Sequence, residues 1–144
     1  MKKEFQIHEL PEIVGGIVQK ATELRTPSLA TVIALSGDLG AGKTTLSREL
    51  AKQLGVEHSI TSPTFVIMKQ YPAHIGPWKT LVHIDAYRLN STEELRKLSW
   101  QELCEDPQNL ILIEWPEKVP EAIPAHSLRI TLEHSSETIR EIQY

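Results

Sequence analysis

The chain has 144 residues, a length that fits one domain able to bury a hydrophobic core without disulfides or a structural metal, and we treat residues 1–144 as one domain. Apolar residues make up 40% and charged residues 24% of the chain, as is typical of soluble globular proteins. The formal net charge of −4 argues against a stand-alone nucleic-acid binder, because such proteins usually carry a basic surface.

Cysteine content and hydropathy indicate where the protein works. The single cysteine, Cys104, excludes an intramolecular disulfide, and we expect it to pack as a small apolar side chain. The N-terminus has no apolar signal segment, and no run approaches the 18 apolar residues of a membrane span. We therefore expect a cytoplasmic protein that does not contact a membrane.

The first third of the chain alternates between strand and helix patterns. Residues 5–8 predict a short edge strand, and the apolar residues after them recur every three or four positions, which predicts one face of a helix. Residues 30–37 form a near-continuous apolar run, typical of a strand buried on both faces of a sheet. A second helix follows from Lys43, and Gly55 is a favourable residue to end it. The apolar face of the first helix comprises Leu10, Ile13, Val14, Ile17, Val18, Ala21 and Leu24.

A long hairpin is expected after the second helix. Residues 64–71 and 79–89 have strand patterns, and the segment between them contains two prolines and a glycine. Ser91 with Glu94 fits a capping box at the start of another helix, and Ser99 offers a second box of the same kind.

The C-terminal third adds strands to the sheet. Residues 109–115 form another apolar run typical of a buried strand. Residues 127–133 and 138–144 alternate between apolar and polar side chains, which predicts a closing hairpin. The alternation of strands and helices predicts an α/β protein with a mixed, partly parallel sheet and an antiparallel hairpin after the second helix.

Residues 37–44 match the phosphate-binding pattern G-x-x-x-x-G-K-[ST] in full. The match follows a predicted buried strand and opens a predicted helix, so we expect a three-layer, P-loop NTPase-like fold. A side chain at Gly40 or Gly42 would crowd a phosphate or resist the backbone angles that point several N–H groups at it. The positive end of the helix dipole would act at the same place.

The polar residues of the motif have distinct expected roles. The Lys43 ammonium would lie on the β- and γ-phosphates, and we expect it to be exposed when no ligand is bound. The Thr44 hydroxyl would ligate Mg²⁺, and Thr45 would lie near the α-phosphate. The predicted nucleotide contacts in the motif are Gly37, Gly40, Ala41, Gly42, Lys43, Thr44 and Thr45.

Two carboxylates end predicted buried strands, where a P-loop NTPase needs an acid for its metal. Having both Asp85 and Glu114 suggests a division of labour, with one acting on Mg²⁺ and one on the attacking water, and the residues alone leave the assignment open. The chain lacks the [N/T]-K-x-D motif that reads guanine and the D-x-x-G motif of GTPases. We therefore expect ATP and Mg²⁺ rather than GTP.

Four segments together resemble the TsaE (YjeE) family. They are GDLGAGKTT at residues 37–45, SPTF at 62–65, HIDAYRL at 83–89 and IEWPE at 113–117. The resemblance extends over about residues 10–133. The P-loop is shared by a large superfamily, but its combination with H-x-D-x-Y-R and E-W-P is far more specific.

The resemblance implies a bacterial ATPase needed to make threonylcarbamoyladenosine next to the anticodon in tRNAs that read codons starting with A. In this family the transfer is carried out by the partner pair TsaD and TsaB. The ATPase binds that pair and hydrolyses ATP to reset it between turnovers. Contact with tRNA would be indirect, through the complex, and turnover by the chain alone would be weak because no arginine finger is evident.

The resemblance also implies roles for individual residues. Thr44 and Glu114 would hold Mg²⁺, and Asp85 would lie near the γ-phosphate, so Lys43, Asp85 and Thr64 form the expected catalytic set. Thr64 would sense the γ-phosphate, although it equally fits the start of a strand after a proline.

The resemblance implies two further positions near the nucleotide. Trp115 should report nucleotide binding, and the region near Leu10 would lie by the adenine. His83 shares a strand face with Asp85 and is either a structural or a functional histidine. Nothing carries over to the C-terminal hairpin.

Two other functions fit the same P-loop. A small-molecule kinase would need an acceptor pocket and a lid with arginines, for which Arg88, Arg96 and Lys97 form the nearby cluster. A non-catalytic scaffold would use ATP only to order a docking face. Dependence of ATP consumption on an acceptor would indicate the first, and full function without hydrolysis would indicate the second.

Overall fold

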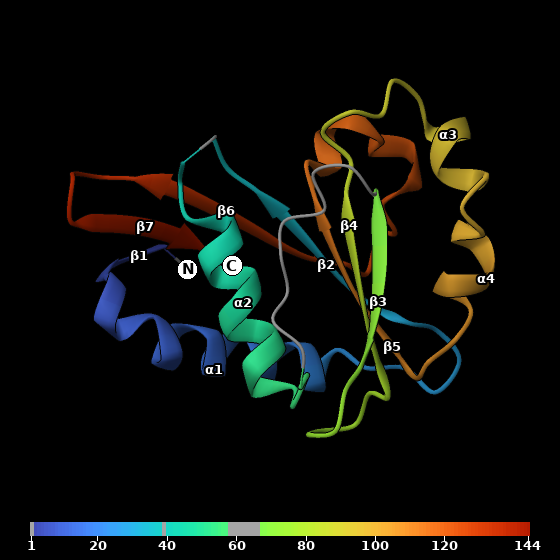
Figure 1. Ribbon diagram of the computed structural model, residues 1–144, viewed down its shortest axis with the longest axis horizontal. Coiled ribbons are helices and arrows are strands. Elements are labelled where there is room, and N and C mark those ends of the chain that lie inside the picture. Colours follow the sequence, from blue (N-terminus) through green and yellow to red (C-terminus); the bar gives the residue numbers. More distant parts are fainter. Residues whose placement is uncertain (1, 39, 58–66) are drawn as a thin grey trace.

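The computed structural model describes residues 2–38, 40–57 and 67–144 (Figure 1). Within these residues, seven strands form one mixed sheet in the order β1-β7-β6-β2-β5-β4-β3. The strands are β1 (Lys2–Gln6), β2 (Thr31–Ser36), β3 (Met68–Pro72), β4 (Thr80–Asp85), β5 (Asn109–Glu114), β6 (Leu128–His134) and β7 (Ile139–Gln143). The helices are α1 (Leu10–Glu23), α2 (Lys43–Gln53), α3 (Thr92–Arg96) and α4 (Trp100–Cys104), with 3₁₀ turns η1 (Ile7–Glu9), η2 (Pro116–Lys118) and η3 (Pro120–Ala122).

The centre of the sheet is parallel, and both of its margins are antiparallel. Strand β2 runs parallel to β5 and β6, and β4 runs parallel to β5. The hairpins β3–β4 and β6–β7 are antiparallel, and β1 adds to β7. The predicted mixed α/β sheet and both predicted hairpins are therefore confirmed, and β2 and β5 are the buried strands that the apolar runs indicated.

Two hydrophobic cores lie on opposite faces of the sheet, which makes three layers. Ile33 and Leu35 of β2 pack on the side of α1 and α2, whereas Val32 and Ala34 pack on the side of α3, α4 and η3. Figure 1 shows these two groups of helices on the two sides of the sheet. Burying each leucine or isoleucine contributes about 1.5–3 kcal/mol, so a strand that is apolar on both faces belongs at the centre.

The ends of some elements differ from the sequence predictions. The edge strand runs from Lys2 to Gln6 rather than over residues 5–8, because η1 leads directly into α1. Helix α2 ends before Gly55, which has φ 73°, as predicted. Ser91 and Ser99 do precede α3 and α4, but neither side chain makes a capping hydrogen bond, so the predicted capping boxes are wrong.

No helix in the described part of the chain is long and apolar enough to cross a membrane. The longest, α1, spans 14 residues and is apolar on one face only. Val18 is half-buried, and Leu24 follows the helix with 41% of its surface exposed, so the assignment of Leu24 to that face is wrong. The other five predicted residues are buried. They are Leu10, Ile13, Val14, Ile17 and Ala21.

Candidate nucleotide site

The loop at residues 37–42 joins the carboxyl end of β2 to the start of α2, with Leu39 outside the described residues. Ligands of open α/β sheets bind in the crevice at this edge. Gly42 is the N-cap of α2 with φ 103°, a conformation that other residues rarely adopt. At Gly37 a Cβ atom would lie 2.3 Å from the carbonyl oxygen of Leu132. Glycine is thus needed at these two positions for different reasons.

Lys43 is buried, with 7% of its surface exposed, so the expectation that it is exposed is wrong. Its ammonium donates to the carbonyl of Gly37 and lies 3.7 Å from the centroid of the Trp115 ring. Burial lowers the pKa of Lys43, and the negative charge of Glu114 opposes that change. The side chain is thus folded against its own loop and must swing away from Gly37 and Trp115 to reach a phosphate.

Trp115 follows β5 directly and has φ 58°, in the left-handed region that bulky residues avoid. Its backbone N–H donates to the carbonyl of Leu35 at 3.3 Å, which fixes the end of β5 beside the end of β2. The indole ring lies 5.0 Å from the ring of Tyr87, at a tilt of 52°. This backbone conformation directs the indole ring toward Lys43. Strained backbone conformations of this kind are common at functional sites.

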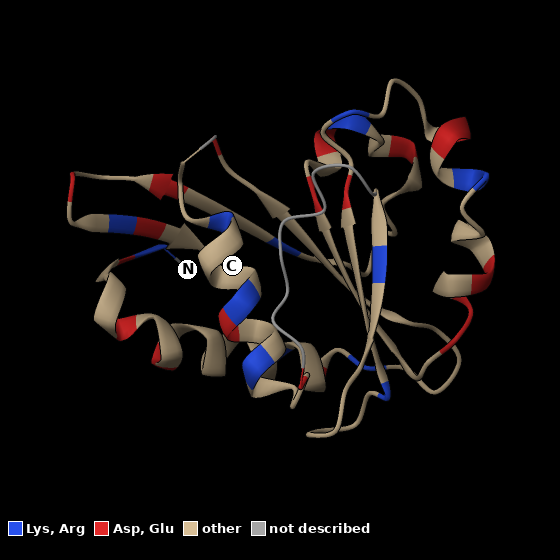
Figure 2. Cartoon of the chain, viewed as in Figure 1, with Lys and Arg blue, Asp and Glu red and all other residues tan. Residues whose placement is uncertain are grey.

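Asp85 and Glu114 lie side by side, because they are register partners at the ends of the parallel strands β4 and β5. Figure 2 shows the two acidic strand ends at the same edge of the sheet. Oδ1 of Asp85 accepts the backbone N–H of Tyr87 at 3.0 Å. Burial raises the pKa of the Asp85 carboxyl, and the neighbouring charge of Glu114 adds to that effect.

His83 holds the second carboxylate in place. Its Nε2 lies 2.6 Å from Oε2 of Glu114, and the two side chains are 1% and 4% exposed. Nδ1 of His83 is buried and has no partner within the described residues. The sequence left open whether His83 is structural or functional. The contact gives it a structural role, because His83 orients Glu114 from the adjacent strand.

The glycine loop and both carboxylates line one open pocket of about 340 Å³. Pockets for small ligands commonly have volumes of about 300–1,000 Å³. The residues that line it are Gly40, Gly42, Lys43, Thr44, Thr45, Asp85, Glu114, Trp115 and Arg140.

Comparison with known proteins identifies the family. Residues 6–142 match the family described as threonylcarbamoyl adenosine biosynthesis protein TsaE. The chain belongs to the TsaE family. The resemblance inferred from its sequence motifs is therefore confirmed.

The alignments with individual relatives cover most of this chain and most of each relative. A tRNA threonylcarbamoyladenosine biosynthesis protein TsaE from Bacillus subtilis (strain 168) is 36% identical over 134 residues, which are 93% of this chain and 80% of the relative. The protein of the same name from Streptomyces coelicolor is 39% identical over 115 residues, 78% of this chain and 76% of the relative. The crystal structure of Bacillus subtilis YdiB superposes with a TM-score of 0.68 at 31% identity, over 99% of this chain and 82% of that one.

The pocket fits Mg²⁺ only together with a nucleotide. Over residues 2–38, 40–57 and 67–144, no group of three or more histidine, cysteine, aspartate or glutamate side chains is placed to hold a metal ion. The side-chain oxygen donors on the pocket wall are those of Thr44, Thr45, Asp85 and Glu114. Mg²⁺ is usually held by one or two carboxylates plus substrate phosphates, which matches this small donor set.

Three predicted site residues, Gly37, Ala41 and Leu10, do not line the pocket. Ala41 is buried under the loop with 1% of its surface exposed, and Leu10 is buried in the core at the start of α1, so neither lines the pocket. Thr64 and the SPTF segment fall outside the described residues. For these positions the expected roles stay predictions.

Two residues of the C-terminal hairpin were missed by the sequence analysis. Arg140 of β7 lines the pocket, and the Nε2–H of His134 in β6 donates to the carbonyl of Gly40. The expectation of no arginine finger stays a prediction, and Arg140 is an additional pocket residue that the motifs did not indicate. One signal was present in the sequence, because strand alternation places Arg140 on the same face as the apolar Ile142.

Proposed function

We propose that the chain is a Mg²⁺-dependent ATPase required for threonylcarbamoyl modification of the adenosine next to the anticodon in tRNA. In this proposal it binds the transferase pair TsaD and TsaB and resets it between turnovers, and it reaches tRNA only through that complex. The observation that carries the proposal is that a P-loop lysine and threonine line the same pocket as two strand-end carboxylates. Membership of the TsaE family supports the pathway.

The loop is built to bind phosphate. Backbone N–H groups at Gly40, Gly42 and the start of α2 would bind the phosphate oxygens, aided by the helix dipole. Lys43 would leave the Gly37 carbonyl and the Trp115 ring and place its ammonium on the β- and γ-phosphates. This movement would change the surroundings of the indole, which supports Trp115 as a reporter of binding.

The carboxylates then divide between metal and water. Thr44 and Glu114 would hold Mg²⁺, which supplies charge neutralisation at the phosphates. Asp85 would accept a hydrogen bond from the water that attacks the γ-phosphorus. The bond between the γ-phosphorus and the β,γ-bridging oxygen breaks, leaving ADP and inorganic phosphate. His83 keeps Glu114 pointing to the pocket through their 2.6 Å contact.

ATP hydrolysis by the purified chain tests the proposal, first alone and then with TsaD and TsaB. We expect slow turnover alone and a large increase with the pair. A missing increase with ATP still bound would instead favour a kinase or a scaffold. The Asp85→Asn variant distinguishes the ATPase from the scaffold. Full tRNA modification by a variant that cannot hydrolyse ATP would contradict the ATPase cycle and support the scaffold.

A matched pair of lysine variants tests the binding site itself. Lys43→Met keeps the apolar length of the side chain but removes the ammonium, so ATP affinity should fall by about 100-fold. Lys52→Met, at the exposed far end of the same helix, should leave ATP affinity unchanged. Equal affinities in the two variants would contradict nucleotide binding at this loop.

Arg96, one of the three cations named for the kinase alternative, gives that alternative no support. Arg96 lies exposed on α3 and pairs with Glu93 in the same helix, rather than facing the pocket. The arginine that does line the pocket, Arg140, comes from the opposite margin of the sheet. ATP consumption that requires a metabolite acceptor would nevertheless favour the kinase over the ATPase.

A further inference from the structure

The hairpin of β6 and β7 lies against the three glycines of the phosphate loop. A Cβ atom at Gly37 would meet the Leu132 carbonyl at 2.3 Å, and one at Gly42 would lie 3.7 Å from Cδ2 of Leu132. Between them, the carbonyl of Gly40 accepts a hydrogen bond from His134. All three glycines of the loop thus face the hairpin, which holds the loop from the side opposite to the carboxylates.

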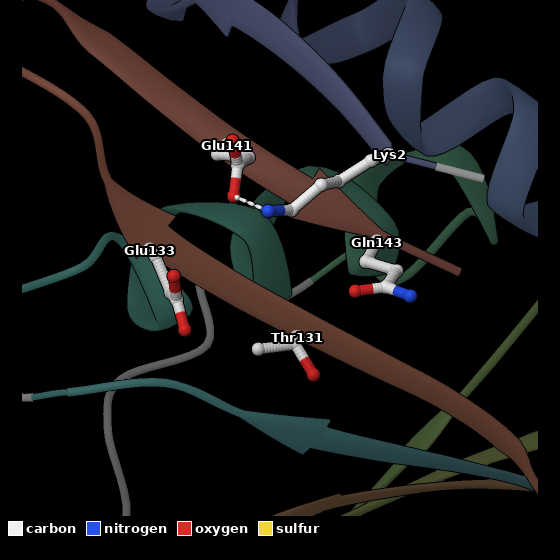
Figure 3. Close-up of a pocket in the computed structure, with 5 residues that line it drawn as sticks. All are labelled: Lys2, Thr131, Glu133, Glu141 and Gln143. Atoms are coloured by element: carbon white, nitrogen blue, oxygen red, sulfur yellow. Dashed lines mark ion pairs between the residues drawn. The ribbon is translucent and has the colours of Figure 1, made fainter.

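The two faces of the hairpin are chemically different. Figure 3 shows its outer face, where Lys2 pairs with Glu141 at 3.0 Å beside Glu133 and other polar side chains. Successive residues of a strand point to opposite faces, so Arg140 points to the inner face, as Ile142 does. The cross-strand pair of Arg140 and His134 continues the buried pair of Ile142 and Leu132 toward the loop.

Arg140 is poorly satisfied by the protein. Its Nη1 reaches the carbonyls of Ser136 and Glu137 only at 3.4 Å each, at the long end of hydrogen bonding. Its Nε is buried and has no partner in the described part of the chain. That nitrogen lies 3.9 Å from where a Cβ at Gly42 would be, so it is held against the last glycine of the phosphate loop.

The charge of Arg140 is also placed against the usual preference. Cations are unfavourable near a helix N-terminus, where the dipole is positive, yet Arg140 lines a pocket with the first residues of α2 and with Lys43. The two carboxylates of that pocket, Asp85 and Glu114, come from β4 and β5, on the other side of β2. A bound anion removes this conflict and supplies an acceptor to Nε. The guanidinium, with its planar set of donors, is suited to phosphate oxygens.

We infer that Arg140 binds the α- and β-phosphates of the nucleotide from the C-terminal hairpin. Strand β2 separates β6 from β5, so Arg140 reaches the loop from the side away from Asp85 and Glu114, where the γ-phosphate and metal are placed. Arg140 therefore contributes to the affinity for ADP and ATP alike and not to the hydrolysis step. This inference rests on the proposed nucleotide-binding function.

Calorimetric titration of the purified chain with ADP and with the non-hydrolysable analogue AMP-PNP, both with Mg²⁺, tests it. In Arg140→Gln we expect both affinities to fall by the same factor, about tenfold or more. Turnover at ATP concentrations well below the Michaelis constant should fall by the same factor. Arg140→Lys, which retains the charge, should recover part of the affinity.

Arg129 provides the matched control, because it is an exposed arginine of the same hairpin on its outer face. Arg129→Gln should bind both nucleotides as the wild type does. Unchanged affinities in Arg140→Gln, or a loss confined to AMP-PNP, would overturn the inference. So would equal losses in Arg140→Lys and Arg140→Gln together with lower thermal stability without nucleotide, since that result indicates a purely structural role.

The failure of the inference is distinguishable from that of the proposed function. If the wild-type chain binds neither ADP nor AMP-PNP, the proposed function fails, and the role of Arg140 fails with it. If the wild type binds and hydrolyses ATP while Arg140→Gln does so with unchanged affinity, only the role of Arg140 is wrong.

Discussion

At the scale of single residues, the contact between His83 and Glu114 is a buried pair whose loss should be costly. Removing one partner of such a pair leaves the other without compensation, which destabilises proteins by about 3–5 kcal/mol. We expect His83→Ala to lower the free energy of unfolding by about 3 kcal/mol or more in urea denaturation at pH 7. His74→Ala, at an exposed position, should change it by less than about 0.5 kcal/mol.

Lost volume also destabilises a core, so a second variant is needed at His83. The amide of His83→Gln can still donate to Glu114 and should recover part of the stability. If His83→Gln were as unstable as His83→Ala, the cost would come from packing rather than from the contact with Glu114.

The ionised carboxylate of Asp85 should lower the stability of the fold at neutral pH, although the proposed hydrolysis requires it. Its pKa is raised above the ordinary 3.8, so the folded protein binds the proton more tightly than the unfolded chain does. The contribution of Asp85 to the free energy of unfolding therefore falls as the pH rises above 3.8, and the ionised form destabilises the fold at neutral pH. Asp85→Asn removes this penalty and keeps an acceptor for the N–H of Tyr87.

We accordingly expect Asp85→Asn to have a melting temperature at pH 7 equal to or above that of the wild type. Its stability should depend less on pH between 4 and 7, and its ATP turnover should fall by about 100-fold or more. A melting temperature well below that of the wild type would show that Asp85 stabilises the fold, contrary to the direction of its pKa.

At the scale of elements, α1 contains two adjacent glycines with different reasons to be there. A Cβ at Gly15 would meet its nearest neighbour, Oε1 of Gln53, at 3.8 Å, which is an ordinary contact. A Cβ at Gly16 would lie 2.9 Å from the hydroxyl of Tyr144. Alanine is favoured over glycine in a helix interior by about 1 kcal/mol.

Gly15→Ala should therefore raise the free energy of unfolding by about 0.5–1 kcal/mol, as measured by urea denaturation. Gly16→Ala should gain less, because Tyr144 has to move. Combining Gly16→Ala with Tyr144→Ala tests this reason: the substitution at Gly16 should be more favourable in the shortened background. Equal gains at Gly15 and Gly16 in the wild-type background would contradict it.

Elements defined by local patterns were predictable from the sequence. The apolar runs of β2 and β5, the periodicity of α1 and the P-loop are all encoded by residues close in the chain. The absence of capping hydrogen bonds from Ser91 and Ser99 could not be predicted, because a favourable residue type does not decide what its side chain contacts. The bounds of β1 likewise depend on its pairing with β7, which is far away in sequence.

The same distinction applies to the candidate site. Lys43, Thr44, Asp85 and Glu114 were found from motifs, since each lies at the end of a recognisable strand or the start of a helix. The contact of His134 with the loop spans 94 residues of sequence, and no local pattern reports it. The burial of Lys43 could not be predicted either, because it depends on how Trp115 is turned by its backbone.

At the scale of the whole molecule, Cys104 reports whether the face of the sheet covered by α3 and α4 is intact. This half-buried residue ends α4, packs on the core of that face, and receives the N–H of Ala30 at its carbonyl. Burial raises the pKa of the Cys104 thiol from 9.0 to about 11. The sequence prediction of a packing role agrees with this environment.

The thiolate is the reactive form, and two pKa units reduce its fraction at pH 8 by about 100-fold. Alkylation of the folded chain by iodoacetamide at pH 8 should therefore be about 100-fold slower than alkylation of the same chain in urea. The rate in the folded protein should keep rising up to about pH 11, whereas in urea it should level off near pH 9. Equal rates in the two conditions would mean that α4 does not pack as described, and that this half of the molecule opens freely in solution.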